Sequence, residues 1–181
     1  MLLNKRGVSD VVTTILLVLL AIVAVAVVAG FIIPFVQNTL KSGTECLKYN
    51  DYFKFQENFN VGLENYKYNC HQGNLYGISV SANGDAALAD NIQGFSVALE
   101  GTGSSETARV EDNTMNNHVH MLGQASPITL SVPKTGEIKT YVYDSMNTFN
   151  KMKIYAVLKS GRTCDMSDEI DIIPCYGVTL G

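Results

Sequence analysis

Extended basic blocks and catalytic motifs are missing from this sequence. Its net charge is −4 and it has no basic block beyond the Lys5-Arg6 pair, so we do not expect nucleic-acid binding. It contains no P-loop, nucleophile elbow or dinucleotide fingerprint, so we expect neither an enzyme nor a bound cofactor. It also has no Asn-x-Ser/Thr sequon, which excludes N-glycosylation at the usual signal.

Cysteine is scarce, and its placement is informative. All four cysteines lie after a long hydrophobic segment, and none of them forms a Cys-x-x-Cys pair. An even number in a part of the chain expected to be exported favours disulfides, with zinc ligands or reduced thiols as the alternatives. Three pairings are possible. We favour Cys46–Cys70 and Cys164–Cys175, because each closes a short local loop.

Charged residues are absent from Val11 to Leu40, and the mixed sequence resumes at Lys41. As a helix, residues 11–36 would extend roughly 39 Å, which exceeds the roughly 30 Å hydrocarbon core of a bilayer. The run is too long for the core of an ordinary signal peptide, and no Ala-x-Ala cleavage site lies between its end and the remainder. We therefore expect a membrane-spanning helix with the preceding basic pair on the cytoplasmic side. A permanent signal anchor is the simplest interpretation.

A small residue lies between the basic pair and the helix, where Lys5, Arg6, Gly7 and Val8 follow one another. Ser9 and Asp10, which favour a helix N-terminus, come next. The segment resembles the class III signal peptide of archaeal type IV pilins and archaellins, although many relatives have proline at the position of Asp10.

This resemblance implies a sequence of domains. A prepilin peptidase would cut after Gly7, so that residues 1–7 are a cleaved signal peptide and Val8 is the mature N-terminus. Residues 8–40 would be a hydrophobic helix that anchors the protein in the membrane and then forms a filament core. Residues 42–181 would be the extracellular head.

The hydrophobic helix is apolar on all sides, so it must be buried in lipid or among copies of itself. Small residues such as Ala24 allow close helix contacts. Gly30 and Pro34 are expected to bend or loosen the helix. The residues assigned to polymerisation are Val11, Ile15, Leu19, Ala24, Val28, Gly30 and Pro34.

After residue 42 the hydrophobic pattern has the period of β-strands. Alternating runs fall at 78–82, 95–99, 128–132, 138–142 and 152–158, with turn sequences such as Asn83-Gly84-Asp85 and Lys159-Ser160-Gly161 between them. The predicted fold class is α+β: a long N-terminal helix followed by an antiparallel β-sandwich. The Gly94-Phe95 strand, the Pro133–Glu137 turn and the strand after that turn resemble the immunoglobulin-like head of archaeal pilins.

Three groups of residues in the head invite a functional interpretation. The first is a group of aromatic residues that could bind a glycan or a partner subunit. We favour the alternative, that these residues pack on the strands of the head. The second is the His118-x-His120 pair near Glu111 and Asp112, an incomplete metal site. The third is an acidic run without calcium-loop spacing, which favours a solvated face. The aromatic group comprises Tyr49, Tyr52, Phe53, Phe55, Phe59, Tyr66 and Tyr68, and the acidic run comprises Asp165, Asp168, Glu169 and Asp171.

The sequence predicts a structural subunit of a type IV pilus-like surface filament. Its expected partners are copies of itself, the prepilin peptidase and assembly machinery, the membrane before assembly, and surfaces or neighbouring cells. A membrane-tethered extracellular binding module and an archaellin are the alternatives. We expect neither a metal nor nucleic acid among the ligands.

Overall fold

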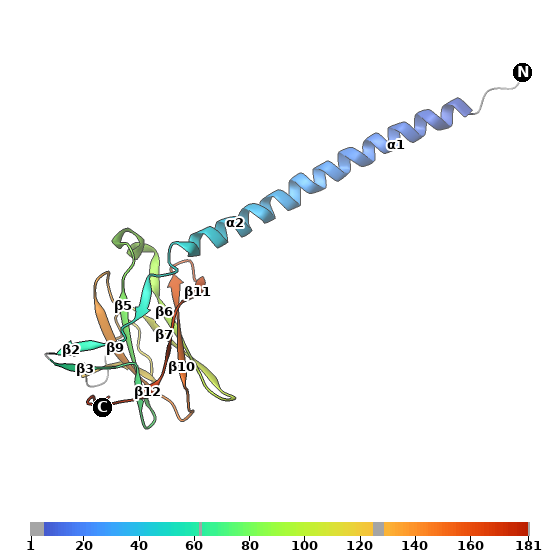
Figure 1. The fold of residues 1–181 in the computed structure, drawn as a ribbon. Coiled ribbons are helices and arrows are strands. Elements are labelled where there is room, and N and C mark those ends of the chain that lie inside the picture. Colours follow the sequence, from blue (N-terminus) through green and yellow to red (C-terminus); the bar gives the residue numbers. More distant parts are fainter. Residues whose placement is uncertain (1–5, 62, 125–128, 181) are drawn as a thin grey trace, which may run out of the picture. The chain divides into compact units, whose positions relative to one another are not determined.

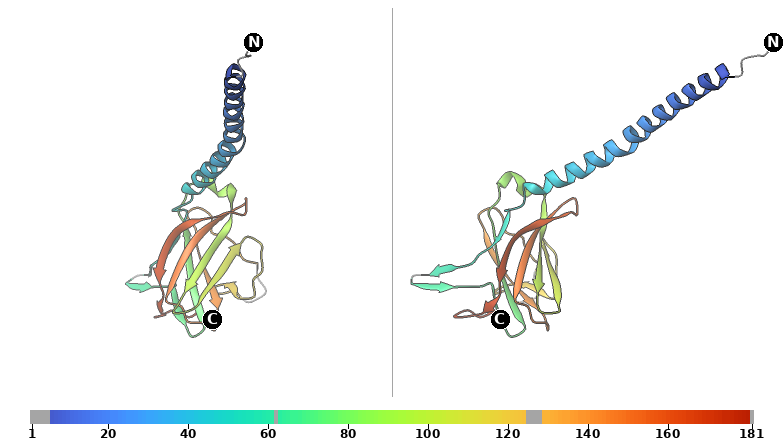
Figure 2. Two further views of the ribbon diagram at one scale, coloured as in Figure 1. Left: turned by 90° about the vertical axis from the view of Figure 1, so that its right-hand side faces the viewer. Right: turned by 45° about the vertical axis from the view of Figure 1, so that its right-hand side comes forward.

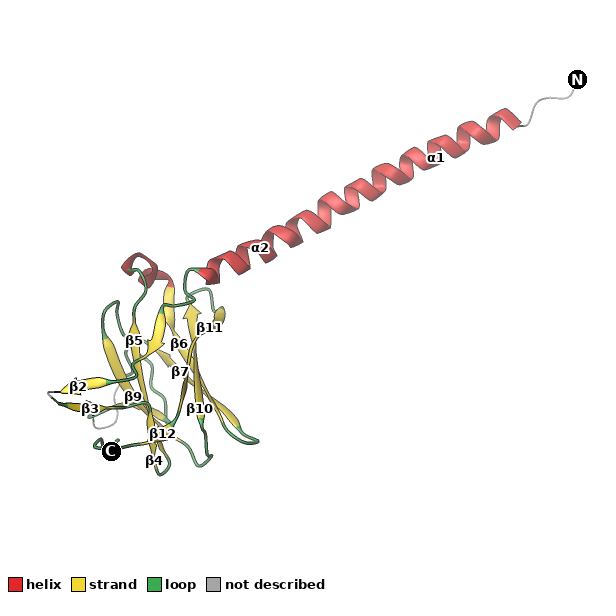
Figure 3. Ribbon diagram, viewed as in Figure 1, coloured by secondary structure: helices red, strands yellow, loops and turns green. Residues whose placement is uncertain are grey.

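The computed structural model describes residues 6–61, 63–124 and 129–180 (Figure 1). The chain divides into two compact units, Met1–Glu45 and Cys46–Gly181. The first is helical, and the second is built mainly of strands (Figure 3).

The first unit is a long apolar helix. It consists of α1 (Arg6–Val27), a π-helical turn η1 (Val28–Ile32) and α2 (Ile33–Leu47). The stretch Val11–Gln37 has a mean hydropathy of 3.3 and is long and apolar enough to cross a membrane. Helical structure continues beyond the predicted end at Leu40 as far as Leu47. Within it, the hydroxyl groups of Thr39 and Thr44 donate to carbonyls one turn earlier. The unit boundary falls after Glu45, so the last two residues of α2, Cys46 and Leu47, belong to the second unit.

The second unit, called the head, contains a six-stranded and a four-stranded sheet. The six-stranded sheet has the order β12-β4-β5-β9-β8, with β1 also paired to β5. Its strands are β1 (Phe53–Phe55), β4 (Cys70–Gln72), β5 (Leu75–Ala82), β8 (Val119–Met121), β9 (Ile138–Asp144) and β12 (Ile173–Pro174). Among the described pairings of this sheet, β12 with β4 is parallel and the others are antiparallel.

The four-stranded sheet has the order β11-β10-β6-β7 and is antiparallel. Its strands are β6 (Ile92–Glu100), β7 (Ser105–Glu111), β10 (Lys151–Leu158) and β11 (Thr163–Asp171), and the short 3-10 helix η2 (Ala86–Asn91) precedes β6. A separate hairpin of β2 (Phe59–Val61) and β3 (Glu64–Tyr66) projects from the side of the head (Figure 2).

One hydrophobic core joins the two larger sheets. The predicted apolar positions of β5, β6 and β10 are all buried, which confirms the alternation in these runs. Across the core, the ring of Phe95 lies 5.2 Å from that of Phe53 and 5.4 Å from that of Tyr141. The confirmed core residues are Ile78, Val80, Ala82, Phe95, Val97, Leu99, Met152, Ile154, Ala156 and Leu158.

The strand predicted at 138–142 exists, but its core face was assigned wrongly. Tyr141 lies opposite Ile78 of β5, and Thr140 lies opposite Ser79. Opposed residues on paired strands point to the same face, so the tyrosines point into the core with Ile78. Ile138 is 44% exposed. Tyr141 is tolerated in the core because its hydroxyl donates to the Ser131 carbonyl at 2.6 Å.

The strand predicted at 128–132 is not observed in its described part, and Ile128 lies outside the described residues. Leu130 and Val132 are buried as the alternation predicted. Their backbone instead bonds to the segment after β7: Leu130 N–H donates to Thr114, and Val132 N–H to the Asp112 carboxylate at 2.7 Å. A side-chain acceptor thus replaces a strand partner just before Pro133, which has no N–H to donate.

The predicted disulfide pairing is wrong. The structure joins Cys46 to Cys164 and Cys70 to Cys175. The local-loop argument failed because strands distant in sequence become neighbours: β12 pairs with β4 so that Ile173 lies opposite Cys70. The N–H of Cys175 then donates to the His71 carbonyl at 3.0 Å, which brings Cys175 to β4.

These long-range disulfides should stabilise the head strongly. Closing a loop of about 100 residues contributes roughly 4.7 kcal/mol in the chain-entropy model. We therefore expect Cys70→Ser/Cys175→Ser to lower the free energy of unfolding by about 2–5 kcal/mol, measured by denaturant titration. Non-reducing peptide mapping of the wild-type protein should recover Cys46–Cys164 and Cys70–Cys175, and finding the local pairs would contradict the fold.

A polar contact between the two sheets should make stability depend on pH. The Tyr143 hydroxyl of β9 donates to the Glu106 carboxylate of β7 at 2.6 Å, and the Asn147 amide donates to the same group. These hydrogen bonds, with that from Tyr143 first, hold the pKa of Glu106 below its usual 4.5. Because the folded pKa is the lower one, the contribution is complete above about pH 4.5 and decreases as the pH falls below it.

We expect Glu106→Gln to cost about 1–2 kcal/mol at pH 7, after allowance for the partial exposure of the carboxylate. The cost should shrink toward pH 3, where the wild-type carboxylate is protonated. Urea titrations at both pH values measure it, with Glu64→Gln at an exposed position of β3 as the control. An equal loss at both pH values would contradict the role of the charge.

Candidate functional site: the apolar helix and a cleft in the head

The apolar helix is the most unusual surface of the chain. Every residue from Val11 to Gln37 is exposed within the single chain, and Leu20, Phe31 and Phe35 are at least 70% exposed. Burying one such side chain contributes roughly 1.5–3 kcal/mol, so this surface is strongly driven to leave water. It requires lipid or another apolar protein surface around it.

The predicted polymerisation residues lie along this helix. Val11, Ile15, Leu19 and Ala24 belong to α1, Val28 and Gly30 to η1, and Pro34 to the first turn of α2. Val11, Ile15 and Leu19 are spaced by four and therefore share one face. A methyl group added at Gly30 would meet nothing within 4 Å in the single chain. The glycine is thus free to accept a neighbouring helix at close range.

The π-helical turn has a local cause. In an α-helix, the N–H of Pro34 would bond to the carbonyl of Gly30, but proline has no N–H. The backbone hydrogen bonds instead span five residues at this point: the N–H of Ile33 donates to the carbonyl of Val28. The irregularity predicted around Gly30 and Pro34 is therefore present as one π turn within a helix that continues on both sides.

The predicted cleavage site is only partly described. Lys5 lies outside the described residues, whereas the backbone of Arg6, Gly7 and Val8 belongs to α1. The helix thus begins before Ser9 and Asp10, which were predicted to start it. Gly7 is therefore helical in this structure.

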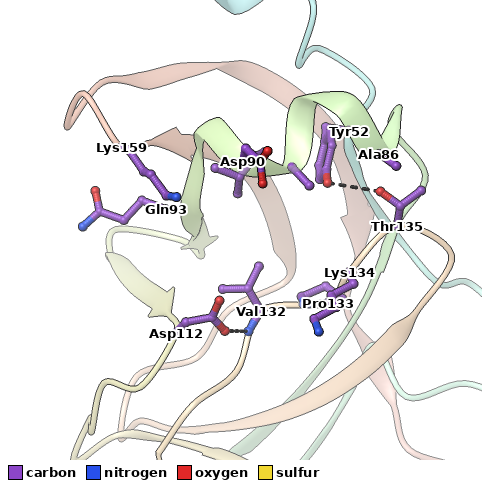
Figure 4. Close-up of a pocket in the computed structure, with 12 residues that line it drawn as sticks. Tyr52, Ala86, Asp90, Gln93, Asp112, Val132, Pro133, Lys134, Thr135 and Lys159 are labelled. Carbon is purple, nitrogen blue, oxygen red and sulfur yellow. Dashed lines mark hydrogen bonds between the residues drawn. The ribbon is translucent and has the colours of Figure 1, made fainter.

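The head carries an open cleft of about 500 Å³ (Figure 4). It lies between η2 and the segment 132–135, with Asp90, Gln93 and Lys159 on one side and Lys134 and Thr135 on the other. The Tyr52 hydroxyl lies 3.3 Å from that of Thr135. The residues that line the cleft are Tyr52, Ala86, Ala89, Asp90, Ile92, Gln93, Asp112, Val132, Pro133, Lys134, Thr135 and Lys159.

Chemically, the cleft offers carboxylates, amines and aliphatic groups, but its described lining includes neither histidine nor cysteine. Such groups are suited to holding a small polar molecule. Sequence reasoning missed the cleft, because its residues come from segments far apart in the chain and share no periodicity. Only the fold brings them together.

The two histidines do not converge on a metal site. His118 directly precedes β8 and His120 lies within it, and the ring of His118 lies 6.3 Å from that of Tyr143. The Asp112 carboxylate accepts the Val132 N–H, and Glu111 is paired with Arg109. Within the described ranges, no group of three or more His, Cys, Asp or Glu side chains could hold a metal ion.

The acidic run forms part of β11, which was not predicted as a strand because few of its residues are apolar. Asp168 accepts the Phe55 N–H at 2.9 Å and so links β11 to β1. Glu169 lies 3.4 Å from Lys151 on the neighbouring strand. Asp165 and Asp171 are exposed. Two residues of the acidic run thus contact neighbouring strands, and the other two face solvent.

The aromatic group separates into two parts. Tyr49, Tyr52, Phe53 and Phe55 are at most 5% exposed and belong to the core, as the packing interpretation predicted. The remaining three, Phe59, Tyr66 and Tyr68, lie at the projecting hairpin and are half-buried. There the rings of Phe59 and Tyr68 meet edge to face, 5.0 Å apart.

Comparison with known proteins adds no relative. No protein-family model matches the chain, and no curated protein matches it at a significant level.

Proposed function

We propose that the chain is a structural subunit that polymerises through its apolar helix into an extracellular filament of the type IV pilus kind. The observation that carries this proposal is the helix itself: Val11–Gln37 is uncharged, strongly apolar and wholly exposed in the single chain. Outside a membrane, the shelter that matches such a helix in length is a bundle of identical helices.

The head suits the outside of such a filament. Its two sheets share one core and carry two disulfides, which are typical of proteins that function in an oxidising, extracellular compartment. We assign it to the β-sandwiches of immunoglobulin-like type, with the parallel β12–β4 pair as an addition. Copies of the head arrayed on the filament would present the cleft and the projecting hairpin to surfaces or neighbouring cells.

Processing and location follow from the same proposal. The precursor inserts its helix into the cytoplasmic membrane, with Lys5 and Arg6 on the cytoplasmic side. A prepilin peptidase removes residues 1–7, and the assembly machinery withdraws the mature subunit from lipid into the filament.

A membrane-tethered binding module is the second candidate, and the cleft of about 500 Å³ favours it. In that function the helix stays in lipid and the cleft holds a small polar ligand. N-terminal sequencing of surface material distinguishes the two candidates. A filament subunit begins at Val8, whereas a simple anchor begins at Met1.

A further inference from the structure

We propose that the two disulfides make the head resistant to tension: a force applied at its N-terminal end is carried by covalent bonds and bypasses most of the core. The entry point rests on the proposed function, since a helix held in a filament or a membrane pulls on the head at Cys46, its first residue. The covalent route itself depends only on the fold.

The first step of this route is the Cys46–Cys164 bond. Cys46 stands before every strand of the head, and Cys164 lies in β11 near the end of the chain. Strands β1 to β10 therefore lie inside a covalent loop whose ends are 118 residues apart in sequence. Tension between Cys46 and the C-terminal end reaches β11 without passing through any of them.

The second bond makes the route redundant. Cys70–Cys175 joins residues 105 apart, and the order of the four cysteines interleaves the two bonds. Each bond alone shortens the path from Cys46 to the C-terminus. Together they tie the edge strand β11 of the four-stranded sheet, through β12, to β4 of the six-stranded sheet.

The covalent bonds increase the resistance of the head to tension, because its strands are otherwise held together by individually weak contacts. A backbone hydrogen bond contributes about 1 kcal/mol, and strands that are pulled apart lose such bonds one after another. A bypassed core bears little of the load. A pairing of near neighbours, Cys46–Cys70 with Cys164–Cys175, would leave most strands in the path of the load.

Single-molecule stretching of the full chain tests this inference. The protein is held in detergent micelles with a peptide tag at each end coupled to DNA handles, and its fully extended length is measured before and after reduction with dithiothreitol. Reduction should lengthen the wild-type chain by about 390–425 Å, the length of the 118 residues released from the loop. The helix contributes equally in both states, so it cancels.

Two variants sharpen the result. Oxidised Cys46→Ser/Cys164→Ser should gain about 345–380 Å on reduction, since the remaining bond hides 105 residues. Oxidised Cys70→Ser/Cys175→Ser should gain as much as the wild type. Thiol labelling selects molecules in which the remaining bond has formed, so poor folding of a variant does not obscure the length.

A wild-type gain of only about 120 Å, which local pairing would give, would overturn the inference, as would no gain at all. The measurement needs no filament. A positive result together with a chain that never assembles would therefore leave the load path standing and reject the proposed function alone.

Discussion

Cells producing the Ala24→Asp variant should carry no filaments of this chain, while the head remains folded. Ala24 lies in α1, within the uncharged stretch Val11–Gln37. A carboxylate at the centre of an apolar helix costs about 3 kcal/mol on insertion scales, and a helix bundle offers it no partner. At 1.4 kcal/mol for each tenfold change, every subunit addition becomes more than 100-fold weaker.

The measurement is electron microscopy of sheared surface material, together with immunoblotting of the membrane fraction. The same substitution at an exposed position of the head, Ala87→Asp in η2, is the matched control and should leave filaments intact. Recovery of the two native disulfides from Ala24→Asp by peptide mapping would show that the head still folds. Normal filaments of Ala24→Asp would mean that the helix is not their core.

Blocking the processing site should have an equally complete effect. Gly7→Glu places a bulky charge where the proposed peptidase requires a small residue, so the precursor should keep its first seven residues. The retained Lys5 and Arg6 hold the helix in the membrane, because moving their charges through lipid costs several kcal/mol. The variant should appear only in the membrane fraction, as a slightly larger band that begins at Met1.

Gly7→Ala is the control, since it keeps the residue small, and it should be processed and assembled. If Gly7→Glu is cut normally and forms filaments, the boundary between signal peptide and mature chain lies elsewhere. If neither variant nor the wild type is cut, the helix is a permanent anchor and the tethered-module alternative gains support.

The helix and several strands were predictable from sequence because their signals are local. An uncharged run of this length has few alternatives to an exposed or lipid-facing helix, and the alternation at Ile78, Phe95 or Ile154 needs only the two-residue period of a strand. Even the irregularity near Gly30 and Pro34 follows from the missing N–H of proline.

What the sequence did not reveal depends on contacts between distant segments. The orientation of β9 is set by its register with β5, so Tyr141 rather than Thr140 points into the core. The partner of Cys70 is set by the parallel pairing of β12 with β4. β11 was not predicted because few of its residues are apolar, so its sequence lacks the hydrophobic alternation that marks a strand.

The cleft was beyond prediction for the same reason. Asp90, Lys134 and Lys159 belong to separate segments and meet only in the folded head (Figure 4). The cleavage residues differ from the cleft, because they were predicted from a short local pattern. The fold of the head neither supports nor opposes that prediction.

Helical reconstruction of purified surface filaments by electron cryo-microscopy would show whether the apolar helix of this chain forms their core. We expect a homopolymer of this chain in which residues from Val8 to about residue 40 pack in the centre and the heads lie outside. Density for the central helices should be continuous through Val28–Ile32, with the π turn retained. Filaments with another subunit at their centre, with this chain confined to the membrane fraction, would show that the chain does not polymerise through its helix.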